Sequence, residues 1–245
     1  MVKNIFGRIW ATWGSLVFIV VMLIFFPFFL LCLLWKEPKR SRITYPIFRL
    51  WMNIYLPLIG VFISIKGKKY FKKGANYIVL CNHSSLMDVP VSSPYIPGPN
   101  KTIAKIEMSR IPVFGTIYKL GSVLVDRKDK DSRLKSYIRM KEVLNAGLHM
   151  CIYPEGTRNK TGLPLKEFHD GAFKLAVDSR KPIMPAVLFN TSKILSSTKT
   201  MHLLPGLIRF HFLPPVEITP ATNADDLKKA VFDMMWQYYE ANKSK

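Results

Sequence analysis

A histidine and an aspartate stand five residues apart in the segment Asn82-His83-Ser84-Ser85-Leu86-Met87-Asp88, directly after the apolar run 77–81. Residues five apart on a regular helix are turned by about 140° from each other, so His83 and Asp88 can meet only if the chain enters a helix between them. In such a turn the carboxylate holds one imidazole nitrogen and leaves the other free as a general base. The spacing also fits an ordinary helix N-terminus, in which a neighbouring Asn or Ser is the cap and the histidine is incidental.

A second reactive segment, Glu155-Gly156-Thr157-Arg158, directly follows the apolar run 148–153. Its glycine permits a tight turn at this point of the chain. Such a turn can aim the carboxylate, hydroxyl and guanidinium side chains, together with exposed backbone N–H groups, into one cleft. An arginine placed there could bind a phosphate through two parallel hydrogen bonds. A single turn of this kind does not by itself identify a function.

Two further cations, Lys105 and Arg127, stand near the C-terminal ends of short apolar runs. Because α/β folds place their sites at strand ends, we expect both cations and Arg158 to line one cleft with His83. The alternative is that any one of them is a solvated surface charge, since the chain has 36 Lys and Arg residues.

The elements that would position these residues begin near Lys66, where short apolar runs start to alternate with amphipathic stretches. The runs predict strands over residues 77–81, 102–106, 123–126, 148–153, 183–189 and 208–212. Apolar residues at helical spacing predict helices over residues 108–120, 131–146, 168–179 and 224–242. This alternation indicates an α/β fold. Neither a Walker A loop nor a G-x-G-x-x-G follows a strand, which argues against nucleotide hydrolysis and dinucleotide redox chemistry.

The N-terminal part of the chain is far more apolar. Residues 9–35 include no charged residue, and a membrane span needs about 20 such positions. A second apolar stretch, residues 43–65, is interrupted by Arg49 and by prolines, and Trp and Tyr residues stand near the ends of both stretches. We therefore predict a membrane-associated pair of helices over 1–65, either spanning or re-entrant, ahead of a domain over 66–245. Alternatively, the second stretch is a core helix of that domain.

Charge and cysteine content narrow the class of protein. The 245 residues carry a formal charge of +20, which implies anionic partners such as nucleic acid, lipid headgroups, phosphorylated substrates or an acidic carrier protein. The three cysteines lie far apart in apolar runs, which argues against a disulfide framework and against a zinc site. Basic residues gather after the first apolar run, at 36–42, and predict that the domain lies on the cytoplasmic side of an inner or plasma membrane.

Four blocks of this sequence, taken together, resemble the motifs of the bacterial 1-acyl-glycerol-3-phosphate acyltransferases of the phospholipid/glycerol acyltransferase superfamily. Residues 82–88 are similar to the family's His-x4-Asp motif, and its third motif, Glu-Gly-Thr-Arg, stands unchanged at 155–158. The second motif is similar to residues 105–115 followed by 121–127, and the fourth to residues 181–187. The order and spacing of the four blocks agree, and the resemblance covers about 66–216.

The resemblance implies an α/β fold with a mixed central sheet flanked by helices, behind a membrane-associated two-helix segment. It further implies transfer of an acyl group from acyl-CoA or acyl carrier protein to the sn-2 hydroxyl of lysophosphatidic acid, among membrane lipids and without a cofactor. Carried over to this chain, His83 is the general base and Asp88 its orienting partner. The positions implied to bind the acceptor are Lys105, Arg127 and Arg158 for its phosphate and Glu155, Gly156 and Thr157 along the rest of the site.

One block departs from the family pattern, because His169-Asp170 stands where many members have a basic pair before Gly-Ala-Phe. This lowers the positive charge expected at that turn and introduces a second His-Asp pair. Adjacent residues rarely face each other, so we expect these two to be surface residues without a catalytic role. The other histidines, His149, His202 and His211, have no carboxylate or cysteine at ligand spacing and are expected to be structural.

Other functions explain less of the sequence. A membrane-tethered nucleic-acid-binding module would account for the charge, but it predicts basic residues interleaved with stacking aromatics, and the aromatics lie mostly in apolar runs. We therefore expect no nucleic acid partner. A non-catalytic lipid-binding protein would not require His83 and Asp88. Within the enzyme class, the alternative is an acyltransferase for another acceptor, such as glycerol-3-phosphate, another lysophospholipid or a lyso-aminolipid.

Overall fold

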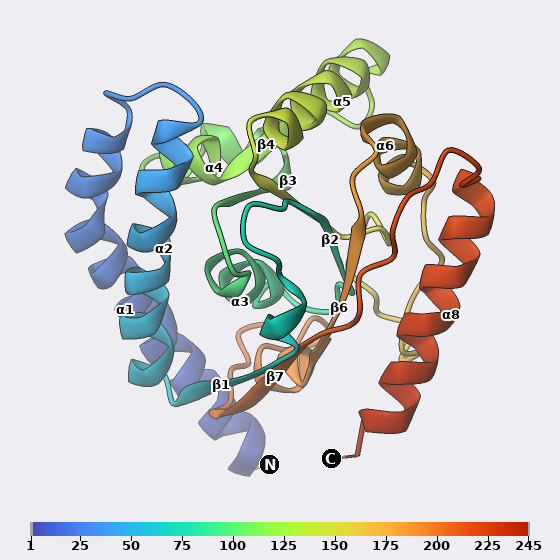
Figure 1. Cartoon of the computed structure of the whole chain (residues 1–245). Coiled ribbons are helices and arrows are strands. Elements are labelled where there is room, and N and C mark those ends of the chain that lie inside the picture. Colours follow the sequence, from blue (N-terminus) through green and yellow to red (C-terminus); the bar gives the residue numbers. More distant parts are fainter. Residues whose placement is uncertain (1, 245) are drawn as a thin grey trace.

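A seven-stranded mixed sheet forms the centre of the protein in the computed structural model, which describes residues 2–244 (Figure 1). The strands are β1 (Val61–Lys66), β2 (Ile78–Cys81), β3 (Asn100–Lys105), β4 (Ser122–Val125), β5 (His149–Ile152), β6 (Ile183–Phe189) and β7 (Gly206–Phe212). Their order across the sheet is β1-β7-β6-β2-β5-β3-β4, and among these pairs β6 and β7 run antiparallel. The predicted mixed sheet is confirmed. Because β2, β3, β4 and β5 run parallel, their carboxyl ends meet at one edge.

Helices cover both faces of the sheet. The helices are α1 (Val2–Cys32), α2 (Lys39–Leu58), α3 (Asp88–Tyr95), α4 (Phe114–Gly121), α5 (Lys130–Asn145), α6 (Gly171–Ser179), α7 (Thr191–Ile194) and α8 (Ala224–Asn242). Side chains of α1 to α4 pack into one apolar cluster, and those of α5, α6 and α8 into another. Strand β2 contributes Val79 to the first cluster and Ile78 to the second. This two-sided burial explains why its sequence is an uninterrupted apolar run.

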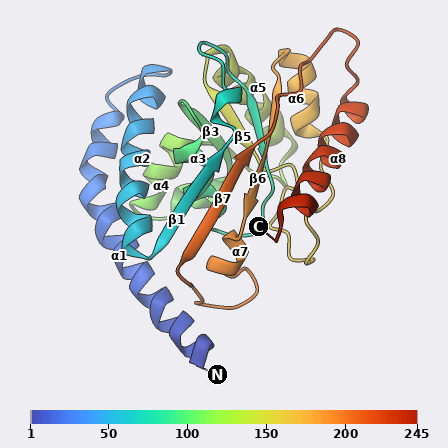
Figure 2. The ribbon, with the colours of Figure 1, turned by 60° about the horizontal axis from the view of Figure 1, so that its bottom comes forward.

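The two N-terminal helices lie side by side along the domain (Figures 1 and 2). The residues of α1 that face inward, including Val17, Phe25 and Phe29, are buried, whereas its outer side exposes a row of apolar residues. That row is Ile5, Phe6, Ile9, Trp13, Leu16, Ile19, Val20, Leu23, Ile24, Phe28, Leu30 and Leu31. Residues 3–32 form the one described helix that is long and apolar enough to cross a membrane. We call α1 and α2 with the intervening turn the helical hairpin.

Three parts of the structure differ from the sequence prediction. The second apolar stretch is helical only to Leu58, and its end forms β1, which pairs in parallel with β7 and joins the sheet. The predicted helix over 108–120 is interrupted: a 3-10 helix, η2 (Ile106–Arg110), precedes α4, because Pro112 has no backbone N–H to donate and Val113 has a φ of +63°. The helix predicted from residue 168 begins at Gly171.

Candidate active site

The segment after β2 folds as a turn into α3 and brings His83 against Asp88. Imidazole Nδ1 lies 2.7 Å from carboxylate Oδ2. Asp88 is the first residue of α3, and the same oxygen accepts the backbone N–H groups of Ser84 and Ser85 at 2.7 Å each. The Asp88 side chain is fully buried. Three donors on one buried oxygen fix the carboxylate, and the carboxylate fixes the orientation of the ring.

The imidazole of His83 faces a cleft at the carboxyl edge of the sheet. Its side chain is 18% exposed, and within residues 2–244 its Nε2 has no hydrogen-bond partner. The ring of Tyr153 stacks on it with centroids 4.4 Å apart, and the Tyr153 hydroxyl is 2.6 Å from Oγ of Ser92. The ring is therefore held by a hydrogen bond at one nitrogen and by stacking on one face, while its second nitrogen is available to a bound molecule.

Glu155 anchors the backbone of the base from a neighbouring strand end. One of its carboxylate oxygens accepts the backbone N–H of His83 at 2.8 Å, and the other accepts that of Lys166 at 3.1 Å. The side chain is fully buried. Burial raises the pKa of Glu155 to about 7, and the two backbone hydrogen bonds oppose this shift only in part. Although the resemblance implied that Glu155 lines the acceptor site, the structure places it behind the cleft, joining two strand ends.

Gly156 forms the turn that the sequence indicated. It has a φ of +68°, and a Cβ at this position would lie 2.7 Å from the ring of His169. Its carbonyl accepts a hydrogen bond from the guanidinium of Arg127. Thr157 is held in turn by the ammonium of Lys166, which lies 2.9 Å from its Oγ1. Only a glycine fits this backbone conformation without moving the histidine, so the turn is fixed on both sides.

The cleft has a volume of about 420 Å³ and brings together most of the predicted site residues. Those that line it are His83, Lys105, Arg127, Gly156, Thr157 and Arg158. Lys160, which was not predicted, adds a fourth cation. Neither Arg158 nor Lys160 has an ion pair or hydrogen bond within the described chain. A cleft with one imidazole, four cations and no acidic lining residue among those described attracts an anionic ligand.

The second His-Asp pair does not form a comparable arrangement. Asp170 faces α8, where its carboxylate lies 2.6 Å from the ammonium of Lys228, and it also approaches Lys174. This pairing lowers the pKa of Asp170 through the hydrogen bond from Lys228. The ring of His169 is exposed and packs against the turn at Gly156. Neither residue lines the cleft. Among the described residues, no three His, Cys, Asp or Glu side chains are grouped as metal ligands.

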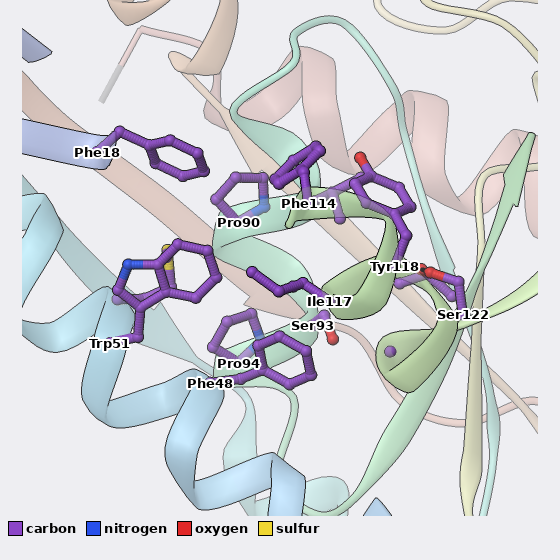
Figure 3. Close-up of a pocket in the computed structure, with 14 residues that line it drawn as sticks. Phe18, Phe48, Trp51, Pro90, Ser93, Pro94, Phe114, Ile117, Tyr118 and Ser122 are labelled. Carbon is purple, nitrogen blue, oxygen red and sulfur yellow. Dashed lines mark hydrogen bonds between the residues drawn. The ribbon is translucent and has the colours of Figure 1, made fainter. Parts of the chain in front are cut away.

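An apolar pocket adjoins the cleft (Figure 3). It is narrow, about 80 Å³, and shares the lining residues Val89, Thr102 and Tyr118 with the cleft. Aromatic rings from both helices of the hairpin and from α4 close it, and they are Phe18, Phe48, Trp51 and Phe114. Sequence reasoning did not find this pocket, because its mostly apolar residues come from six separate elements. Tyr153 was also missed as a partner of His83, although it stands two residues before Glu155.

Comparison with known proteins extends these observations. The family model described as Acyltransferase matches residues 62–188, just over half of the chain. Curated relatives named 1-acyl-sn-glycerol-3-phosphate acyltransferase include those of Helicobacter pylori, 37% identical over 146 residues (59% of this chain, 60% of that protein), and Cocos nucifera, 33% identical over 162 residues (65% and 51%). That of Escherichia coli is 30% identical over 168 residues (66% of each). The matches thus span between half and about two thirds of these relatives.

The fold has a solved counterpart. A crystal structure of the 1-acyl-sn-glycerophosphate acyltransferase PlsC from Thermotoga maritima superposes with a TM-score of 0.85 at 21% identity. The alignment covers 99% of this chain and 98% of that one, so the likeness includes the helical hairpin as well as the sheet.

Proposed function

Because this chain belongs to the acyltransferase family, we propose that it transfers an acyl group from a thioester donor to the free sn-2 hydroxyl of 1-acyl-glycerol-3-phosphate, giving phosphatidic acid. The observation that carries the proposal is the His83–Asp88 contact of 2.7 Å at the wall of a cleft that also contains four cations. An oriented imidazole supplies a general base for an alcohol, and the cations suit a phosphorylated acceptor. The names of the relatives favour this acceptor over others in the family.

In the proposed reaction His83 acts through Nε2. It removes the hydroxyl proton of the acceptor as the oxygen attacks the carbonyl carbon of the thioester. The tetrahedral intermediate then collapses, the carbon–sulfur bond breaks, and the leaving thiolate takes the proton from the imidazolium. Asp88 remains a carboxylate and stabilises the imidazolium while it exists. No side chain of the protein is acylated in this reaction, because the acceptor oxygen itself is the nucleophile.

In this proposal, separate groups of the cleft bind separate parts of the acceptor. We place its phosphate on Lys105, Arg127 and Arg158, of which Arg127 also donates to the carbonyl of Gly156. The apolar pocket of Figure 3 lies next to the cleft, and at about 80 Å³ it would take only the first few methylene groups of an acyl chain. The donor would be acyl-CoA or acyl carrier protein, and we expect no cofactor. Gly156 and Thr157 would contact the acceptor, while Glu155 positions His83 through its backbone.

We further propose that the outer face of α1 contacts the bilayer in its plane. The hairpin is fastened to the domain at both ends: Leu203 N donates to Gly7 O in α1 at 3.0 Å, and Glu37 in the turn pairs with Lys101. With its turn held against β3, the hairpin lies along the domain, and the exposed apolar row on α1 is the surface suited to lipid. The domain would then face the cytoplasm at the inner or plasma membrane.

A transfer assay on the purified full chain tests the proposal. Lysophosphatidic acid, glycerol-3-phosphate and a lyso-aminolipid are offered with acyl-CoA and with acyl carrier protein as donor. We expect phosphatidic acid from the first acceptor and little product from the others. Asp88→Asn should reduce turnover with little change in KM, because it loosens the ring and leaves the phosphate site intact. Preference for another acceptor would contradict the proposed substrate, and no transfer to any acceptor would contradict the activity.

A further inference from the structure

A third cavity, of about 660 Å³, opens between α1 and residues 195–203, next to the catalytic cleft. We call it the α1 groove. Leu86, Arg158 and Lys160 line both the groove and the cleft, so the two cavities meet at these residues. The groove is the larger of the two, and the proposed acyl transfer does not use it.

The wall on α1 is apolar and is set back by small side chains. Ala11, Gly14, Ser15 and Phe18 follow each other at intervals of three, one and three residues and so lie on one face of the helix. The three small residues leave room between the helix and the segment opposite. Ile19 belongs both to the exposed apolar row of α1 and to the lining of the groove, so an alkyl chain could pass from that surface into the groove at this residue.

The opposite wall, residues 195–203, has polar side chains between Leu195 and Leu203. Four of its residues carry hydroxyl groups, and Lys199 adds a cation. The ammonium of Lys199 lies 3.1 Å from Oδ1 of Asn4, an uncharged partner. Arg158 and Lys160 add two cations at the junction with the cleft, and no Asp or Glu of the described chain lines the groove. This wall therefore has an excess of positive charge and no anion of the protein to balance it.

His202 is an unpartnered polar group in this groove. Its side chain is 94% buried, being only 6% exposed, and neither ring nitrogen has a hydrogen-bond partner within residues 2–244. It lines the groove beside α1, where a Cβ on Gly7 would lie 2.6 Å from the ring. A buried imidazole without a partner is costly unless another molecule supplies the partner. An anionic oxygen in the groove would be such a partner.

We propose that the α1 groove binds a phosphate-headed lipid and passes it between the bilayer and the catalytic cleft. The alkyl part would lie against α1, and the phosphate would lie on Lys199 and Lys160 within reach of Arg158. The transport role rests on the proposed function, whereas binding of the lipid does not. The groove wall is also tied to the catalytic turn, because Ser85 Oγ donates to Leu195 O at 2.7 Å. A lipid in the groove would thus lie one hydrogen bond away from the segment that carries His83.

A blocking substitution tests occupancy directly. Ser15→Trp places a large side chain in the groove from the α1 wall. Thr12→Trp is the matched control, because Thr12 is also exposed on α1 but lies outside the groove. Both native hydroxyls donate to the backbone carbonyl four residues earlier. Full-length protein is mixed with phosphatidylcholine vesicles containing photoreactive phosphatidic acid, and cross-linked peptides are identified by mass spectrometry. We expect adducts within residues 195–203 for the wild type and Thr12→Trp, and their loss for Ser15→Trp. Equal labelling of that segment in all three would overturn the proposal.

A charge substitution tests the phosphate contact. Lys199→Gln removes one cation from the groove, and Lys193→Gln removes one from α7 outside it. Losing one charge-assisted contact should raise the KM for vesicle-held lysophosphatidic acid by about tenfold at unchanged kcat for Lys199→Gln only. Equal KM values for the two variants would contradict the phosphate contact. Vesicle co-sedimentation of both variants checks that general membrane binding is equal.

Competition in the cross-linking assay shows whether the groove binds the phosphate of a lipid, free inorganic phosphate or the phosphates of acyl-CoA. Short-chain phosphatidic acid should abolish labelling of residues 195–203, while inorganic phosphate and acyl-CoA should not. If acyl-CoA alone competes, the groove is a donor site and the lipid proposal is wrong. Because labelling is read without turnover, a wild type that labels but transfers nothing would contradict the proposed function and leave groove binding established. A wild type that transfers but does not label would contradict only the groove.

Discussion

The ammonium of Lys101 in β3 lies 2.7 Å from the carboxylate of Glu37 in the turn of the helical hairpin. Lys101 is 6% exposed and also donates to Leu120 O at 3.1 Å. Burial raises the pKa of Glu37, but the contacts with Lys101 and Ser41 outweigh it and leave that pKa below its ordinary value. The hairpin is therefore joined to the sheet by an ion pair with a buried ammonium and a partly exposed carboxylate, at the end farthest from its covalent connection.

Glu37→Gln should destabilise the protein by about 1–3 kcal/mol, because it leaves the buried ammonium of Lys101 without an anion. Adding Lys101→Met should recover part of this loss, since the unpaired charge is then gone. Glu240→Gln is the control, because it breaks an exposed pair with Lys243 and should cost at most about 1 kcal/mol. Thermal unfolding in detergent measures all variants, and equal melting temperatures for Glu37→Gln and Glu240→Gln would show that the buried pair does not fasten the hairpin.

His83→Ala should lower the rate of transfer by about 10² to 10⁴ through loss of the general base. Its melting transition should persist, because Asp88 keeps its two backbone donors. His169→Ala is the control on the exposed histidine and should retain turnover. Initial rates of transfer at saturating substrate are measured for both variants. If His169→Ala lost activity and His83→Ala kept it, His169 and not His83 would be the general base.

Arg158→Ala should weaken binding of lysophosphatidic acid by roughly tenfold or more, since one charge-assisted contact to phosphate is worth about 1.5–3 kcal/mol. Monoacylglycerol, which has no phosphate, should be affected far less. Arg127→Ala should act similarly but also lower kcat, because Arg127 holds the carbonyl of Gly156 in the catalytic turn. KM values for both acceptors, with exposed Arg139→Ala as control, provide the test. Equal losses for the two acceptors would instead indicate a structural role for Arg158.

Glu155 should make the stability of the protein depend on pH. Its pKa is raised by burial from 4.5 to about 7, so the folded state takes up a proton that the unfolded state does not hold in this range. The free energy of unfolding should therefore fall as the pH rises from about 4.5 to about 7. Glu155→Gln should flatten this slope, whereas Glu217→Gln on the surface should keep it. Urea unfolding at several pH values measures the slopes, and parallel curves for wild type and Glu155→Gln would contradict the assignment.

The protein should stay with membranes through a high-salt wash and need detergent for release. The exposed apolar row on α1 supplies a contact that salt does not screen, whereas charge attraction at the basic residues fades within a Debye length of about 3 Å at 1 M salt. Leu16→Glu and Leu23→Glu together should make salt extraction possible, because they place charges in the middle of that row. Release of the wild type by salt alone would contradict the membrane-facing role of α1.

The central strands could be predicted because a strand that is buried on both faces is a continuous run of apolar residues in the sequence. Strand β6 was predicted at 183–189 and occurs there, and β2 and β5 lie within the predicted runs. All three are buried along their whole length, so each is an apolar run with clear ends. The helix predicted over 224–242 matches α8, which Asn223 caps through the N–H of Asp225.

The parts that could not be predicted depend on contacts between distant residues. β1 lies inside an apolar stretch, and the partner that makes it a strand, β7, is far along the chain. The stacking of Tyr153 on His83 and the burial of Glu155 likewise require the relative placement of β2 and β5. The cations were predictable as strand-end residues, but only the folded cleft distinguishes Lys160 from other surface lysines.

The pairing of β1 with β7 also determines when the sheet can be completed during synthesis of the chain. The first strand made must wait for residues 206–212, so the edge of the sheet closes only when nearly all of the chain has left the ribosome. Until then the inner faces of α1 and α2 are covered only in part, by α3, α4 and β3. A shortened chain beginning at residue 66 would leave β7 as an open edge prone to aggregation, which makes the hairpin and its strand part of one folding unit with the domain.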